Sequence, residues 1–203
     1  MKRLPTTLAA GAFALLLATP AFADIAVLEG QAPGALDPVS FTGGDTGFQI
    51  VGLVGPDDAQ VTVNGAEALV VQGQTIEAVA DTFNFLLFTL ADAGLAFTSA
   101  QFNLNAAAAG TTTIRAFDQF GNDFGGTFSV GVNGANFFHV SATAGQRIQS
   151  IVVMSSADLE DVSQIRLGGI SALVPEPASW GMMILGFGAA GAVIRQRRRS
   201  ATL

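Results

Sequence analysis

Short runs of apolar residues follow one another along most of the chain, separated by Gly, Asn and Asp. Runs such as GFQIVGLVG and TTTIRAFD are rich in β-branched and aromatic residues, which is typical of short strands. About ten or eleven such runs occur at spacings of about 8–14 residues, and no long 3.6-residue period interrupts them. The pattern predicts an all-β body over residues 24–174, an antiparallel β-sandwich with jelly-roll-like character.

Several local patterns refine this prediction. The Asn64-Gly65 pair between two apolar runs predicts a tight hairpin turn. The run TFNFLLFTL is apolar on both sides and favours a strand in the middle of a sandwich or barrel. Residues 92–96 are expected to form a short turn, and the alanines of 106–109 a loop. The stretch SSADLEDV, residues 155–162, begins with a serine suited to an N-cap and predicts one helical turn.

The first 23 residues follow the three-part plan of a secretory signal peptide. Two basic residues precede an apolar run over 8–18, which is short for a membrane span. Ala21 and Ala23 then form an A-x-A cleavage site before Asp24. We therefore expect a signal-peptide helix over residues 1–23, removed by signal peptidase on export; a retained N-terminal anchor is the alternative.

The other end of the chain, residues 175–203, has a different pattern. Residues 178–194 carry no charge and as a helix would cover about 26 Å, the short end of a bilayer core. Trp180 lies at one border of this segment, and at the other lies an arginine cluster, Arg195, Arg197, Arg198 and Arg199. The sequence thus predicts a C-terminal transmembrane helix with its arginines in the cytoplasm.

Charge and composition exclude several classes of function. Between the two ends, fifteen acidic residues stand against three arginines, so the formal charge of the body is −12, compared with −7 for the whole chain. Such a surface repels phosphate backbones, and we expect no nucleic-acid partner. The absence of cysteine excludes disulfides, thiol catalysis and cysteine-zinc sites. The body also lacks the Trp and Tyr side chains that sugar-binding modules commonly display.

Candidate chemistry in the body is sparse. His139 is the only histidine and lies in a strand run; without a G-x-S-x-G motif nearby, an ordinary strand histidine is favoured over a catalytic one. The loop FDQFGNDFGG offers oxygen ligands for a weak calcium site at Asp118, Asn122 and Asp123, although it does not match an EF-hand. The alternative is a plain β-turn in which Asp and Asn bond the local backbone. We expect no catalytic residue and no cofactor beyond this possible Ca²⁺.

The C-terminal residues resemble the PEP-CTERM sorting domain. The resemblance is carried by an ordered set that covers about 25 residues of the chain: Pro175, Glu176, Pro177, Trp180, the Gly186-Phe187-Gly188 triplet and the arginine cluster. It is similar to the PEPxxWA subgroup, from which Gly181 departs, since alanine is usual there. The resemblance implies recognition by an exosortase, cleavage near Pro-Glu-Pro, and transfer to the cell surface or matrix of a bacterium that makes exopolysaccharide.

The sequence therefore favours a non-enzymatic exported protein of the cell surface, extracellular matrix or biofilm. Its expected partners are signal peptidase, an exosortase, the membrane before processing, and exopolysaccharide. The expected route is an inner-membrane-anchored precursor with its body in the periplasm. Two alternatives remain: a carbohydrate- or calcium-binding extracellular module, and a secreted hydrolase that uses His139.

Overall fold

The apolar runs form an antiparallel β structure in the computed structural model, which describes residues 24–55, 59–132, 134–173, 181–188, 190–191 and 195. Every strand pairing in the described residues is antiparallel. The described strands are β1 (Ile25–Glu29), β2 (Asp37–Phe41), β3 (Thr46–Val54), β4 (Ala59–Gln72), β5 (Thr75–Ala78), β6 (Phe83–Leu90), β7 (Leu95–Ala96), β8 (Ser99–Ala106), β9 (Gly110–Asp118), β10 (Asp123–Val130), β11 (Asn136–Ala142), β12 (Ile148–Gly168) and β13 (Ser171–Ala172).

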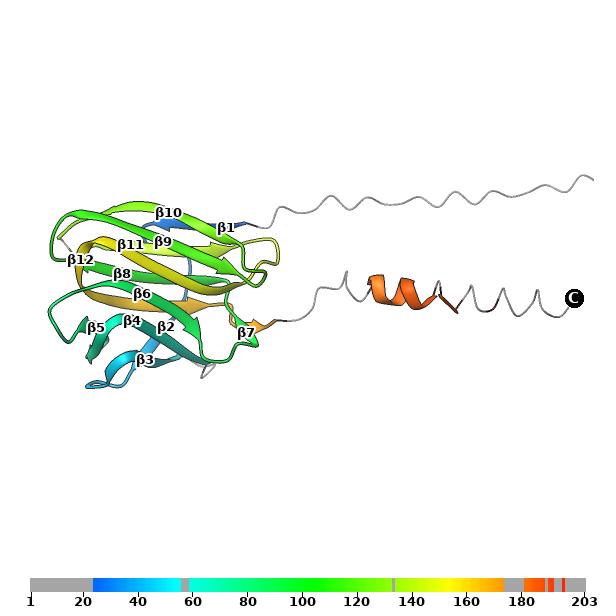
Figure 1. Ribbon diagram of the computed structural model, residues 1–203, viewed down its shortest axis with the longest axis horizontal. Helices are drawn as coiled ribbons and strands as arrows, with labels where there is room; N and C mark the ends of the chain where they lie inside the picture. Colours follow the sequence, from blue (N-terminus) through cyan, green and yellow to red (C-terminus); the bar gives the residue numbers. More distant parts are fainter. Residues whose placement is uncertain are drawn as a thin grey trace, which may run out of the picture.

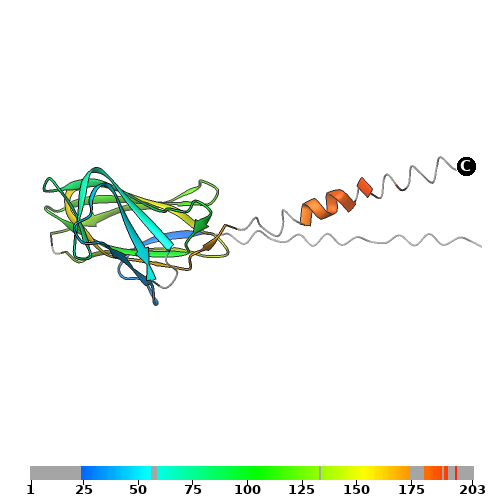
Figure 2. The same cartoon turned by 90° about the horizontal axis from the view of Figure 1, so that it is seen from below.

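The long strand β12 belongs to two layers. Its first part, over 148–155, lies between β6 and β9, in the order β10-β9-β12-β6-β4. Its second part, over 159–168, pairs with β8 and β2 and continues the order β1-β11-β8-β12. Figures 1 and 2 show these strands running along the long axis of the body. The arrangement confirms an antiparallel all-β body consistent with a sandwich; its jelly-roll-like character stays a prediction.

The core between the layers is filled by aliphatic and phenylalanine side chains. Phe102, about 1% exposed, stacks on Phe88 at a centroid distance of 5.3 Å and packs against Phe138 at 6.1 Å. Strand β6 lies inside its sheet, with β12 on one side and β4 on the other. Buried and half-buried side chains alternate along it, so the expectation from a run that is apolar on both sides is met only in part. Phe83 is buried in the core as well, at a point where β12 changes layers and its register shifts.

Two local predictions are wrong. The Asn64-Gly65 pair forms no hairpin turn, because β4 runs through it; the turn to β5 lies at Gly73, which has a φ of +68°. At Asn64-Gly65 the strand instead leaves its register with β3 while it still pairs with β6. Residues 155–162 are strand, not helix. Alternate side chains there, Ala157 and Leu159, enter the core, and tertiary burial outweighs the local capping signal.

The two other local predictions are confirmed in part, because Leu95 and Ala96 of the expected turn belong to β7 and Ala106 of the expected loop ends β8. Residues 92–94 form a turn in which the Asp92 carboxylate accepts a hydrogen bond from the Gly94 backbone N–H at 2.8 Å. The alanines after Ala106 form the loop between β8 and β9.

Candidate functional site

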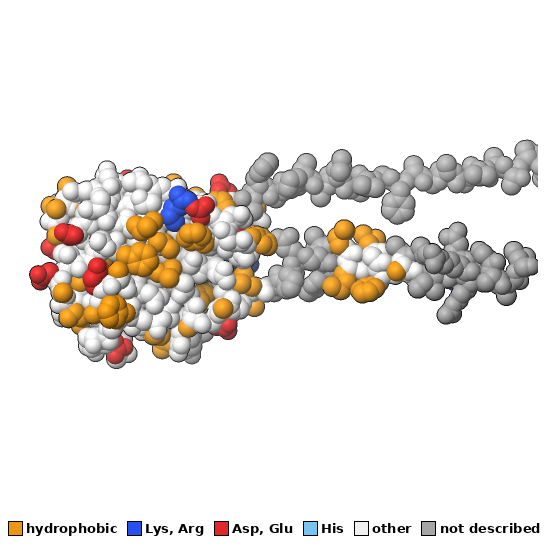
Figure 3. Space-filling view, in the orientation of Figure 1, with side chains coloured by type: hydrophobic (Ala, Val, Ile, Leu, Met, Phe, Trp, Pro, Cys, Tyr) orange, Lys and Arg blue, Asp and Glu red, His pale blue; other side chains and the backbone are white. Residues whose placement is uncertain are grey.

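The predicted sorting residues are only partly described. Pro175, Glu176, Pro177, Trp180 and the arginines Arg197, Arg198 and Arg199 lie outside the described residues. Residues 181–188 are helical and include Gly186, Phe187 and Gly188. Met182, Ile184 and Phe187 are each more than 70% exposed, and Figure 3 shows hydrophobic side chains around this segment. Arg195 is exposed too.

A helix whose large side chains are apolar on every side requires an apolar environment, and the body does not supply one here. Among the described residues, no helix combines the length and the apolar character needed to cross a membrane. The predicted transmembrane helix over 178–194 lies partly outside those residues.

The predicted signal peptide, with Ala21 and Ala23, lies outside the described residues. Asp24, the residue after the predicted cleavage site, is joined to the body directly. Its carbonyl oxygen accepts hydrogen bonds from the Thr143 backbone N–H at 3.0 Å and the Thr143 hydroxyl at 3.2 Å. Strand β1 begins at the next residue, so the fold uses the chain immediately after the predicted cut.

The predicted calcium residues lie together, but their oxygens already have protein partners. Asp118 is fully buried, and its carboxylate accepts four hydrogen bonds. Two come from the backbone N–H groups of Phe120 and Asn122, at 2.8 Å each, and two from the side-chain amides of Asn122 and Gln146, at 2.9 and 3.1 Å. Asp123 forms an ion pair with Arg115.

This geometry is that of an Asx-stabilised turn whose carboxylate is bonded by the protein itself. Within the described ranges, no group of three or more His, Cys, Asp or Glu side chains could hold a metal ion. Calcium binding stays a prediction without structural support.

His139 lies on β11 with only 8% of its surface exposed. Its Nδ1 lies 3.1 Å from the Gly30 carbonyl oxygen, so the tautomer that suits this contact carries a proton on Nδ1 and donates it. The ring thereby fixes the start of the connection between β1 and β2. This contact gives His139 a structural role in the body.

The connection between β1 and β2 crosses the outer face of one layer. β1 pairs with β11 at the edge, whereas β2 pairs with β12 on the other side of β8. Residues 30–36 therefore pass over β11 and β8. There the side-chain amide oxygen (Oε1) of Gln101 accepts a hydrogen bond from the Ala32 backbone N–H at 2.8 Å. At the far side, Leu36 packs over Gly168, where a Cβ would overlap it.

On this outer face the register brings His139, Gln101 and Arg166 into one cross-strand row, with Gln101 opposite both neighbours. Arg166 reaches the face because of a β-bulge at Gln164, which has a φ of +52°. The extra residue shifts the alternation, so Ser163 and Arg166 both point outward although they are three residues apart. Sequence alternation alone would place them on opposite faces.

Two hollows lie on either side of the Gln164 and Arg166 side chains, which line both. One, of about 270 Å³, is completed by Gln101 and by residues 31–32 and 34–36 of the connection. The other, of about 430 Å³, is completed by Ser163, Ile165, β2 residues Pro38 and Val39, and Gln74 and Thr75 near β5. We call the two hollows together the Arg166 groove.

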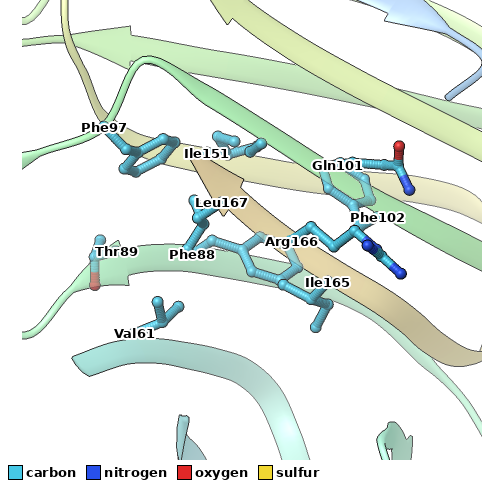
Figure 4. Close-up of a pocket in the computed structure, with 11 residues that line it drawn as sticks. Val61, Phe88, Thr89, Phe97, Gln101, Phe102, Ile151, Ile165, Arg166 and Leu167 are labelled. Atoms are coloured by element: carbon cyan, nitrogen blue, oxygen red, sulfur yellow. The ribbon is translucent and has the colours of Figure 1, made fainter. Parts of the chain in front are cut away.

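Beneath the groove, the space between the layers is closed. A cavity of about 10 Å³ is lined by Val61, Phe88, Phe102 and Ile151 among others, and holds at most about one water. Figure 4 shows Arg166 and Gln101 side by side, their polar ends directed away from the apolar side chains. Among the described residues, the two hollows of the Arg166 groove offer room on the outer surface that this small cavity does not.

Comparisons with known proteins bear on the tail more than on the body. No curated protein matches the chain. One solved structure, of a family 29 carbohydrate-binding module mutant, aligns over 72% of this chain and 92% of its own at 12% identity, with a TM-score of 0.27. At that score the similarity carries no argument about fold or function. The family model of the PEP-CTERM protein-sorting motif matches residues 173–199. The chain thus carries a PEP-CTERM sorting motif directly after the last strand of its β body.

Proposed function

We propose that the chain is the precursor of an exported, non-enzymatic protein of the cell surface or exopolysaccharide matrix, sorted by an exosortase. The match of residues 173–199 to the sorting motif carries this proposal. In it, the apolar segment holds the precursor in the inner membrane, the arginines fix its orientation, and Pro-Glu-Pro presents the cleavage site outside. The body then passes from the periplasm to the surface, matrix or biofilm.

The position of the motif supports a tail that can be removed without disturbing the β body. The last described strand, β13, ends at Ala172, and the motif begins at the next residue. Cleavage near Pro175–Pro177 would therefore leave every described strand intact. The exposed apolar helix over 181–188 contributes nothing to the core, so its removal would not cost the body stability.

The non-enzymatic part of the proposal is supported by how the reactive side chains are used. His139 and Asp118 both serve the fold through hydrogen bonds. A secreted hydrolase that uses His139 therefore has less support. A carbohydrate-binding module within the matrix is the second candidate, favoured by the Arg166 groove.

The test compares the mature protein in cells with and without the exosortase. We expect intact-mass analysis of wild-type cells to give a body from Asp24 to near Pro177, and exosortase-deficient cells to retain the arginine cluster. Glu176→Gln should impair processing, whereas Glu29→Gln, an exposed glutamate at the end of β1, should not. A mature protein that keeps Arg195–Arg199 in wild-type cells contradicts the proposal.

A further inference from the structure

We propose that the Arg166 groove binds an anionic polysaccharide, with a carboxylate of a uronic-acid residue paired to Arg166. The groove is distinct from the sorting motif. The choice of a polysaccharide rests on the proposed surface location, whereas the site itself rests on the geometry around Arg166.

Arg166 is a positively charged side chain in a strongly acidic body. It is one of three arginines in a body with fifteen acidic residues, and its side chain is exposed. Arg115 is paired with Asp123, whereas neither Arg147 nor Arg166 forms an ion pair within the described part of the chain; of these two, Arg166 is the more exposed and lines both hollows. Its planar guanidinium can bind a carboxylate through two parallel N–H donors. The acidic residues of the body repel an anionic polysaccharide as they repel a nucleic-acid backbone, so its binding has to depend on the pair made at Arg166.

The surroundings of Arg166 suit a sugar. The residues that line the two hollows include Gln31, Gln101, Gln164, Ser163 and Thr75, together with Gln74, whose amide bonds the Phe41 backbone. Amides and hydroxyls both donate and accept hydrogen bonds, as sugar hydroxyl groups require. Because the hollows lie on both sides of Arg166, a chain of several sugar residues can pass the arginine without ending at it.

The side chains at the centre are held in place by the fold. Gln101 is 7% exposed, and its carbonyl oxygen is fixed by the Ala32 N–H, which leaves its NH₂ group as the donor beside Arg166. The bulge at Gln164 sets the outward direction of Arg166 and holds a non-glycine residue at a positive φ. Such backbone is unfavourable for most side chains and is commonly found beside binding sites.

The experiment measures binding of polygalacturonate oligomers to the full chain in a neutral detergent by titration calorimetry, with neutral dextran and poly-glutamate as comparison polymers. We expect binding to polygalacturonate alone. Loss of a charge-assisted bidentate pair in Arg166→Gln should weaken it about 10- to 100-fold. Gln164→Gly should weaken it as well, because it removes a side chain that lines both hollows.

The matched control is Arg147→Gln, which makes the same charge change at a residue that does not line the groove and that lies beside Gln119 and Gln146. It should bind as the unmodified chain does, and circular dichroism should show every variant folded. The proposal is overturned if polygalacturonate does not bind, if Arg147→Gln weakens binding as much as Arg166→Gln, or if poly-glutamate or dextran binds equally well. These outcomes are independent of exosortase processing, which is measured in cells.

Discussion

The buried carboxylate of Asp118 provides the sharpest test of the structure, and the substitution is Asp118→Asn. Asparagine keeps the shape and one acceptor oxygen, but it replaces the other oxygen with an NH₂ donor. Whichever way the amide is turned, this donor would face hydrogen-bond donors that now serve the carboxylate. The change therefore removes at least one bond to a charged acceptor and leaves buried donors unpaired.

The expected cost follows from those contacts. Hydrogen bonds to a charged group contribute about 1.5–3 kcal/mol each, and a buried unpaired donor costs about 1–3 kcal/mol. We expect Asp118→Asn to lower the free energy of unfolding by about 3 kcal/mol. For a body of about 150 residues this corresponds to a fall in Tm of about 6–12 °C. The control is Asp123→Asn, which breaks a half-exposed ion pair of about 0–1 kcal/mol.

The assay is thermal unfolding of the full chain and both variants, followed by circular dichroism in EDTA and in calcium chloride. If Asp118 serves the fold alone, calcium leaves the Tm of the unmodified chain unchanged. A Tm that calcium raises in the unmodified chain but not in Asp118→Asn would show that the carboxylate is a metal ligand. Equal falls in Tm for the two variants would refute the hydrogen-bond reasoning.

Three further substitutions probe the fold. Gly125→Ala should detach β10 from β9, because a Cβ there would overlap the Ile114 carbonyl oxygen; we expect a loss of about 2 kcal/mol or more, seen as faster amide exchange in β10. His139→Leu removes the donor to the Gly30 carbonyl and should cost about 1–3 kcal/mol in urea unfolding, and an unchanged midpoint would contradict its structural role. Phe102→Ala empties the centre of the aromatic stack and should cost about 3–5 kcal/mol, whereas a loss below about 1 kcal/mol would show that the core is not packed as described.

The sequence predicts the strands well where burial follows local alternation. The apolar runs over β6 and β9 both led to the observed strands, because alternate side chains of each strand are buried in the core. The prediction fails where tertiary contacts override a local signal. Asn64-Gly65 has the composition of a turn, but both residues pair with β6 as extended chain, and Asn64 still pairs with β3.

The candidate site in the body could not be predicted in the same way. Arg166 follows Ile165 in an ordinary strand run, and nothing in the sequence marks Gln164 as a bulge. The side chains in the cross-strand row with Arg166 are distant from it along the chain, since Gln101 lies on β8 and His139 on β11. By contrast, the sorting motif is a continuous segment recognised by composition and order, so it needs no fold to be found.

The two-layer strand β12 has a consequence for how the protein is made. It pairs with β2, β5, β6, β8 and β9, yet it is the last long strand of the body in chain order. In the proposed export, the earlier strands cross the membrane before β12 does. Until β12 follows, the edges that pair with it are exposed, and exposed strand edges are templates for aggregation. The body can close only when residues 148–168 have emerged. A tail that keeps the precursor tethered at that moment would give the last strand time to arrive before the protein is released.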